Sequence, residues 1–256
     1  MGVLATRRYL NAWWCGAAVA PIAIHAALLM MASERGSAST ISRYARMQVN
    51  TDALLLEAIV SVLAGPLMGV VSSRRRSTSD GGAGSIVRRC GVLGAIFAGS
   101  AAIAHLCVDP TTRIVALTPP HVTLGIATLM ASALGAAAAS IADHPLDAAA
   151  CALLVSGTIG GGVLVAGPLV ADAPAALIDA ALLASPIVAT ASAADIDVLR
   201  GDLLYRFSPI AHRQFVYPAW PTACLIYLAV AAVSFTFVAL RVNRRGRAFP
   251  AERITV

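Results

Sequence analysis

Six long runs of apolar residues recur along the chain, and they limit its fold more than any other feature. An α-helix rises about 1.5 Å per residue, so about 20 residues cross the hydrocarbon core of a bilayer. Each run is close to that length. A bilayer core offers no water to backbone polar groups, so spans of this size are helical. The runs cover residues 12–32, 53–71, 90–108, 121–142, 148–171 and 220–240.

The composition leads to the same conclusion. Of the 256 residues, 58% are hydrophobic and 12% are charged, whereas soluble domains carry roughly 25% charged residues. This balance excludes a soluble globular protein, and it also excludes a disordered chain. We therefore predict an all-α, polytopic integral membrane protein in which residues 1–256 form a single transmembrane domain.

Residues 173–194 are apolar but interrupted by Pro174, Asp179 and Pro186. Prolines and an acid suit a segment buried within protein better than a helix that faces lipid. We predict a re-entrant helical hairpin here, followed by an outer loop over residues 195–219. A full seventh span is the alternative.

The arginines set the predicted orientation. With six spans both termini lie on one side, and 12 of the 19 arginines belong to that side. Because cytoplasmic segments carry the excess of positive charge, both termini are predicted to be cytoplasmic, in a bacterial inner membrane. This placement also explains the net charge of +6 without nucleic-acid binding.

The basic residues exclude several functions, because all 19 are arginine and none is lysine. A Walker A loop requires a lysine for the nucleotide phosphates, and Schiff-base catalysis requires an amine. We therefore predict no enzymatic activity, no catalytic residue, no cofactor and no metal for this chain alone.

Two acidic residues are candidates for a translocation path, Glu57 and Asp179. Carboxylates within membrane spans are often proton relays or substrate contacts. Glu57 lies one turn inside the second run. A second interpretation, which the sequence favours equally, is that Glu57 lies near the outer interface and reaches water.

Three histidines, His25, His105 and His121, lie in or at the ends of spans. Paired histidines on facing helices ligate haem iron in other proteins. His25 is mid-span, whereas the other two lie near the outer side, so their depths match poorly. This favours hydrogen-bonded interior or interfacial histidines over a haem site.

Small residues indicate a tight bundle or a dimer. Gly157, Gly161 and Gly162 form a face that lets helices approach closely.

Two regions carry a resemblance to a known family. The first is Gly65-Pro66-Leu67-Met68-Gly69 leading to Arg74-Arg75-Arg76 and then to residues 87–93. The second comprises residues 183–188, 204–210 and 217–221 before a last span that ends in arginine. Together these parts resemble the membrane subunit of a type-2 ABC transporter. Ser-Asp-Gly-Gly-Ala-Gly stands where that family commonly has Glu-Arg and Gly-Thr.

The resemblance implies an export permease that works with a separate ATP-binding subunit, which binds the ATP, and with a second permease. It implies that the cytoplasmic loop 72–89 couples the two subunits through five arginines, and that the hairpin shapes the outer gate. Two alternatives stay open: a haem-binding membrane anchor of a redox complex, and a membrane assembly protein without transport. The five coupling arginines are Arg74, Arg75, Arg76, Arg88 and Arg89.

Overall fold

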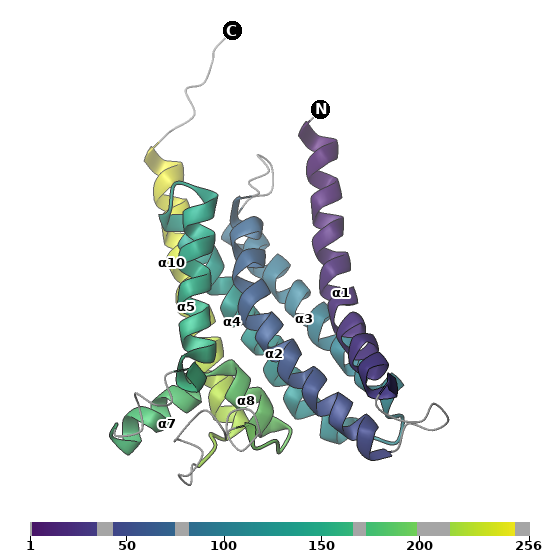
Figure 1. Ribbon diagram of the computed structural model, residues 1–256. Coiled ribbons are helices and arrows are strands. Elements are labelled where there is room, and N and C mark those ends of the chain that lie inside the picture. The colour runs from purple at the N-terminus through teal and green to yellow at the C-terminus, as the bar shows by residue number, and fades with distance from the viewer. Residues whose placement is uncertain (1, 35–42, 75–81, 166–172, 199–215, 249–256) are drawn as a thin grey trace.

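The fold was obtained as a computed structural model, which describes residues 2–34, 43–74, 82–165, 173–198 and 216–248. Within these residues every regular element is an α-helix (Figure 1). Six long helices run along the bundle, and two short ones lie at one end of it. The helices are α1 (Gly2–Glu34), α2 (Arg43–Arg74), α3 (Ala83–Val108), α4 (Ile114–Ile141), α5 (Pro145–Val165), α7 (Ala175–Ala184), α8 (Pro186–Ala193) and α10 (Trp220–Ala248).

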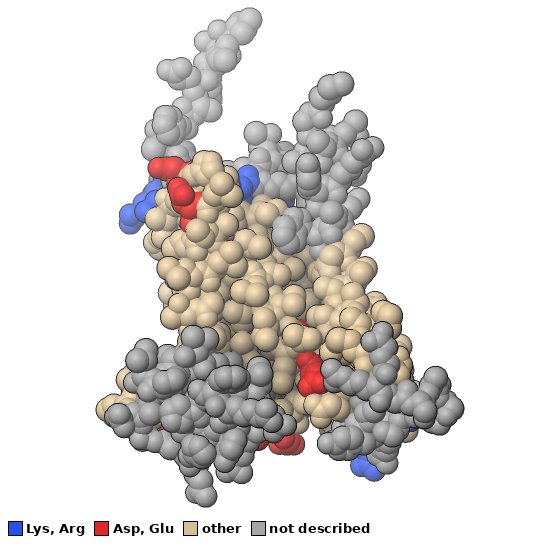
Figure 2. Space-filling view, in the orientation of Figure 1, with Lys and Arg blue, Asp and Glu red and all other residues tan. Residues whose placement is uncertain are grey.

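Six of these helices are long and apolar enough to cross a membrane, as predicted, and the bent pair α7–α8 would make a seventh span only if its two helices are taken together. Figure 2 shows a broad uncharged zone across the middle of the face in view, with the visible charged side chains nearer the two ends. Large apolar side chains such as Ile103, Leu154 and Val233 are exposed, as expected of side chains that acyl chains cover in a bilayer. The chain is a multi-pass membrane protein.

The helix ends differ from the predicted ones. The expected loop 72–89 is too long, because α2 continues to Arg74 and α3 already begins at Ala83. Helix α4 begins at Ile114, so Pro119 and Pro120 lie inside it rather than before it. Propensity and hydropathy locate the centre of a span more reliably than its ends, where polar residues continue the helix.

The interrupted segment forms the bent pair α7 and α8, which meet at an angle of 80°. The bend occurs at Ser185, whose hydroxyl group donates to the carbonyl oxygen of Gly160 and accepts from the backbone N–H of Val188. Pro186 then opens α8, where its missing N–H costs nothing. Helix α8 is almost wholly buried, as a re-entrant segment requires.

Helix α4 is the centre of the bundle and packs against α2, α3, α5, α8 and α10. Its closest contact is with α2, at Gly65, Gly69 and Gly135. A Cβ atom at Gly69 would overlap the backbone of Ser132, and one at Gly135 would overlap the backbone of Pro66. Close backbone approach is a principal source of helix association in lipid, so this α2–α4 seam stabilises the bundle.

The predicted packing glycines lie elsewhere. Positions 157 and 161 face open space, and a Cβ at Gly162 would meet only Thr158 of its own helix. The glycine of α5 that contacts another helix is Gly160, which packs against Val62. Within the described part of the chain, therefore, Gly157 and Gly161 pack against no other helix. Their packing against a second chain stays a prediction.

Candidate metal centre

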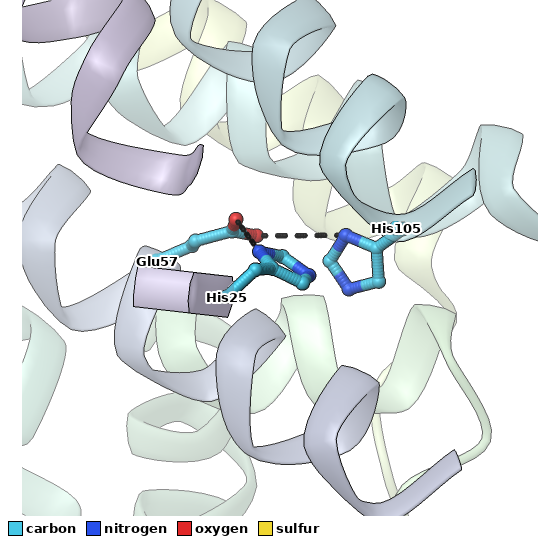
Figure 3. A group of neighbouring side chains, drawn as sticks. All are labelled: His25, Glu57 and His105. Carbon is cyan, nitrogen blue, oxygen red and sulfur yellow. Dashed lines mark ion pairs between the residues drawn. The ribbon is translucent and has the colours of Figure 1, made fainter. Parts of the chain in front are cut away.

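Four consecutive helices bring three histidines and one glutamate together inside the bundle. His25 comes from α1, Glu57 from α2, His105 from α3 and His121 from α4. The end of α1, the start of α2, the end of α3 and the start of α4 lie at the same end of the bundle (Figure 1). Figure 3 shows the side chains of His25, Glu57 and His105 pointing toward one another.

The distances show a compact group. His25 Nδ1 lies 3.5 Å from Glu57 Oε1, and His105 Nδ1 lies 4.0 Å from Glu57 Oε2. His121 Nε2 lies 3.2 Å from His105 Nδ1. The rings of His25 and His105 meet edge to face with centroids 4.4 Å apart, and those of His105 and His121 do so at 4.8 Å. The four side chains therefore form one continuous cluster.

The cluster is closed off from its surroundings. Glu57 is 0% exposed, and the three histidines are at most 6% exposed. The prediction that Glu57 reaches water is wrong, because the side chain turns into the bundle rather than toward the interface. Neither Glu57 carboxyl oxygen has a hydrogen-bond partner, and His25 Nε2 has none either. Burying polar groups without a hydrogen-bond partner is costly. This cost indicates that the site takes up a partner that the described side chains do not supply.

The surrounding backbone fixes the proton positions on two histidine rings. His25 Nδ1 lies 2.9 Å from the carbonyl oxygen of Pro21, and His121 Nδ1 lies 2.6 Å from that of Leu117. A carbonyl oxygen only accepts, so each Nδ1 carries the hydrogen and donates it. The lone pair of each neutral ring is then on Nε2.

His105 has a carbonyl oxygen beside each nitrogen. Its Nδ1 lies 2.9 Å from Ala101 O, and its Nε2 lies 3.1 Å from Asn50 O. A neutral ring has one N–H. With that hydrogen on Nε2 and donated to Asn50, the Nδ1 lone pair faces Glu57. Metal-ligating histidines have this arrangement, in which one nitrogen is a ligand and the other N–H is held by a carbonyl.

His25, Glu57 and His105 each offer one ligand atom, and these three atoms lie within 4.8 Å of one another. Two atoms bound to one tetrahedral zinc ion, each about 2.0–2.2 Å from it, are about 3.3–3.6 Å apart. The widest separation in the group therefore has to shorten by roughly 1 Å for all three atoms to bind one ion. Two histidines and one carboxylate form a ligand set that zinc and non-haem iron use in proteins.

The rings leave no room for haem between them. A haem with two axial histidines has its flat macrocycle between the two rings, whereas these rings contact each other edge to face. Any ion held by the cluster as it stands is therefore bound by the side chains alone.

The sequence prediction of mismatched histidine depths is wrong. The rings of His25, His105 and His121 contact one another edge to face, so they lie at one level of the bundle. Residue counts from the helix ends do not reveal this, because His105 is 3 residues before Val108 whereas His25 is 8 before Ser33.

The other predicted site residues lie away from the cluster. Asp179 is exposed on α7. Arg74 donates to the carbonyl oxygens of Asp143 (2.9 Å) and Ala142 (3.0 Å), so it holds α2 to the connection between α4 and α5. Arg89 lies 3.5 Å from Ser72 O, and Arg88 is exposed. Arg75 and Arg76 lie outside the described residues.

Comparison of the chain with protein-family models, with curated proteins and with solved structures finds no match in any of the three. The resemblance to ABC permeases therefore stays a prediction. The buried cluster is the feature of the described structure that points to a specific chemistry.

Proposed function

We propose that this protein holds a transition-metal ion inside the membrane, with His25, Glu57 and His105 as ligands and His121 at the fourth position. One observation carries the proposal: three ligand atoms from three helices lie within 4.8 Å of one another in a buried site. A cation there gives the unpaired Glu57 oxygens the partner that the protein does not supply.

The ligand types indicate the class of metal. Imidazole nitrogen suits zinc, copper, iron and nickel, whereas magnesium and calcium take oxygen ligands. Two or three imidazoles beside a single carboxylate therefore favour a divalent first-row transition metal. The backbone oxygens of Pro21, Asn50 and Leu117 hold the second nitrogens of the rings, which fixes ring orientation and raises ligand basicity.

The arginine distribution adds an orientation to this proposal. With both termini in the cytoplasm of a bacterial cell, the metal centre lies in the outer half of the inner membrane. The bent α7–α8 pair lies at that same end of the bundle (Figure 1). Under this proposal the protein is a metal-binding membrane protein. The sequence had instead predicted a chain without a cofactor or a metal.

The test is metal analysis of the full-length protein purified in mild detergent. We expect about one transition-metal ion per chain by mass spectrometry of the elements, and its loss in the variants His25→Ala, Glu57→Gln and His105→Ala. His144→Ala is the matched control, because His144 is exposed between α4 and α5. A wild-type protein that binds no ion, even after addition of zinc, copper or ferrous iron, would overturn the proposal.

The ABC-permease hypothesis needs a different experiment. Six spans and the bent pair are compatible with it, and with many other membrane proteins. We expect affinity purification from the native membrane to recover a stoichiometric subunit with a Walker A loop if this hypothesis holds. Recovery of redox subunits, or of no ATPase, would contradict it. Neither result affects the metal measurement.

A further inference from the structure

A pocket of about 210 Å³ lies at the end of the bundle opposite the candidate metal centre. Four spans begin or end around it: α2 ends at Arg74, α3 begins at Ala83, α4 ends at Ile141 and α10 ends at Arg244. The ends of membrane-spanning helices lie at the level of the lipid headgroups. The pocket is therefore placed where the headgroup of a lipid, rather than its acyl chains, meets the protein.

Charged side chains of both signs line this pocket: Arg74 from α2, Arg241 from α10, and Asp143 from the connection between α4 and α5. None of the three forms an ion pair with a residue that the structure describes. The contact between Arg74 and Asp143 uses the backbone carbonyl of Asp143 and not its carboxylate. Figure 2 shows side chains of both signs near one another at this end of the bundle. Two cations and one anion thus share a pocket without pairing.

Both arginines retain hydrogen-bond donors. A guanidinium group has five N–H donors. In the described structure Arg74 uses two of them, on Asp143 O and Ala142 O, and Arg241 uses one, on Ser140 O at 3.5 Å. The carbonyl oxygens at the end of α4 therefore hold the two groups in place and leave other N–H groups for a ligand. Phosphate suits such donors, because it accepts two parallel bonds from one guanidinium group.

The carboxylate of Asp143 decides which phosphate compound fits. A ligand with only negative charge would lie beside a like charge in this pocket, which is unfavourable. A ligand with an ammonium group next to its phosphate gives all three charged side chains an opposite charge. The ammonium group of phosphoethanolamine has N–H donors for the carboxylate, whereas the trimethylammonium group of phosphocholine has none.

Apolar side chains connect the pocket with the lipid phase. Ile86, Val238 and Val242 line it beside the charged groups. The guanidinium group of Arg241 lies 5.7 Å from the ring centroid of Phe237, and Phe237 is one of the large apolar side chains that the bundle exposes. A headgroup in the pocket therefore has an apolar surface next to it for its acyl chains. This favours a membrane lipid over a water-soluble phosphate compound.

We propose that this pocket binds the headgroup of phosphatidylethanolamine, with the phosphate at Arg74 and Arg241 and the ammonium group at Asp143. Under the predicted orientation the lipid belongs to the cytoplasmic leaflet. Basic pockets between membrane helices bind lipid headgroups in other proteins. The proposal depends neither on the metal nor on an ATPase.

The test is native mass spectrometry of the full-length protein released from detergent micelles. The protein receives an equimolar mixture of phosphatidylethanolamine, phosphatidylcholine and phosphatidylglycerol with the same acyl chains. We expect the first bound lipid to be phosphatidylethanolamine about two- to fivefold more often than either competitor, the preference that one exposed ion pair gives. Water-soluble phosphoethanolamine at the same concentration should not compete, because it has no acyl chains.

Variants at the charged positions locate the site. Asp143→Asn keeps the backbone carbonyl that binds Arg74 and removes the negative charge, so the preference should pass to phosphatidylglycerol. Asp147→Asn is the matched control, exposed in the first turn of α5 and outside the lining, and should keep the wild-type preference. Arg241→Gln should lower the binding of both lipids by about two- to fivefold. Arg88→Gln, exposed and also outside the lining, should leave it unchanged.

Equal binding of the three lipids by the wild-type protein would overturn this proposal, and so would a preference that Asp143→Asn leaves unchanged. A wild-type preference for phosphatidylglycerol would show that the arginines only attract anionic lipid, which also overturns it. Competition by water-soluble phosphoethanolamine would assign the pocket to a soluble ligand and overturn the choice of a lipid.

Discussion

Helices α2 and α4 each contribute to two regions that differ in packing. In the α2–α4 seam, Gly65, Gly69 and Gly135 bring the two backbones into contact. Nearer the other end, the same helices carry Glu57 and His121, and both carboxyl oxygens of Glu57 lack hydrogen-bond partners. Close backbone packing stabilises the bundle in the seam, whereas the cluster retains a buried, unpaired carboxyl group. Such a contrast is expected where a site is kept for function.

The largest expected effect tests the cluster. At a free metal concentration of 100 times the Kd, binding stabilises the folded protein by about 2.7 kcal/mol. We expect metal addition to raise the Tm of the wild-type protein in detergent by this mechanism, and to leave the Tm of Glu57→Gln unchanged. Because glutamine removes an unpaired buried carboxyl group, the metal-free variant should be at least as stable as the metal-free wild type. If metal addition raises the Tm of both proteins equally, Glu57 is not a ligand of the metal.

The next effect tests the seam. Gly135→Val places a side chain against the backbone of Pro66, and overpacking of this kind typically costs about 1–3 kcal/mol. We expect a lower Tm in thermal unfolding. We also expect less folded protein after detergent extraction, measured by size-exclusion chromatography. The metal stoichiometry of the protein that does fold should stay near that of the wild type. Loss of metal in this folded fraction would show that seam and cluster are coupled.

A smaller effect is expected at the end of α2 farthest from the cluster. Arg74→Ala removes two hydrogen bonds to the carbonyl oxygens of Asp143 and Ala142. Because Arg74 is exposed, solvent screens its charge. We therefore expect the free energy of unfolding to decrease by about 1 kcal/mol or less. Arg74→Lys should not restore it, since an ammonium group cannot reproduce the planar fork. Full stability of Arg74→Ala, measured by thermal unfolding, would assign Arg74 to another role such as docking.

The smallest effect is the control for the seam. Gly161→Ala adds a Cβ where nothing lies within 4 Å, and substitutions that touch no neighbour usually change stability by less than about 0.5 kcal/mol. We expect an unchanged Tm in the monomeric protein. A clear decrease in Tm, together with loss of a dimer on a native gel, would instead support packing of Gly161 against a second chain.

Sequence by itself determined the membrane-spanning character, the six helices and the interruption at residues 173–194. These features depend on local hydropathy and on proline, and a bilayer permits few other solutions. The sequence did not determine the helix ends or the loop 72–89, because polar residues such as Arg74 and Ser85 continue helices beyond their apolar centres.

The cluster required the tertiary structure. His25 and His105 are 80 residues apart, and their contact depends on helix ends, tilt and rotation, which apolar runs do not encode. Likewise, Gly160 and not Gly157 contacts α2 because of rotation about the α5 axis. The sequence determined which residues enter the membrane, because transfer into lipid depends on composition. Only packing decided which of them meet, because contact depends on the three-dimensional register of helices far apart in the chain.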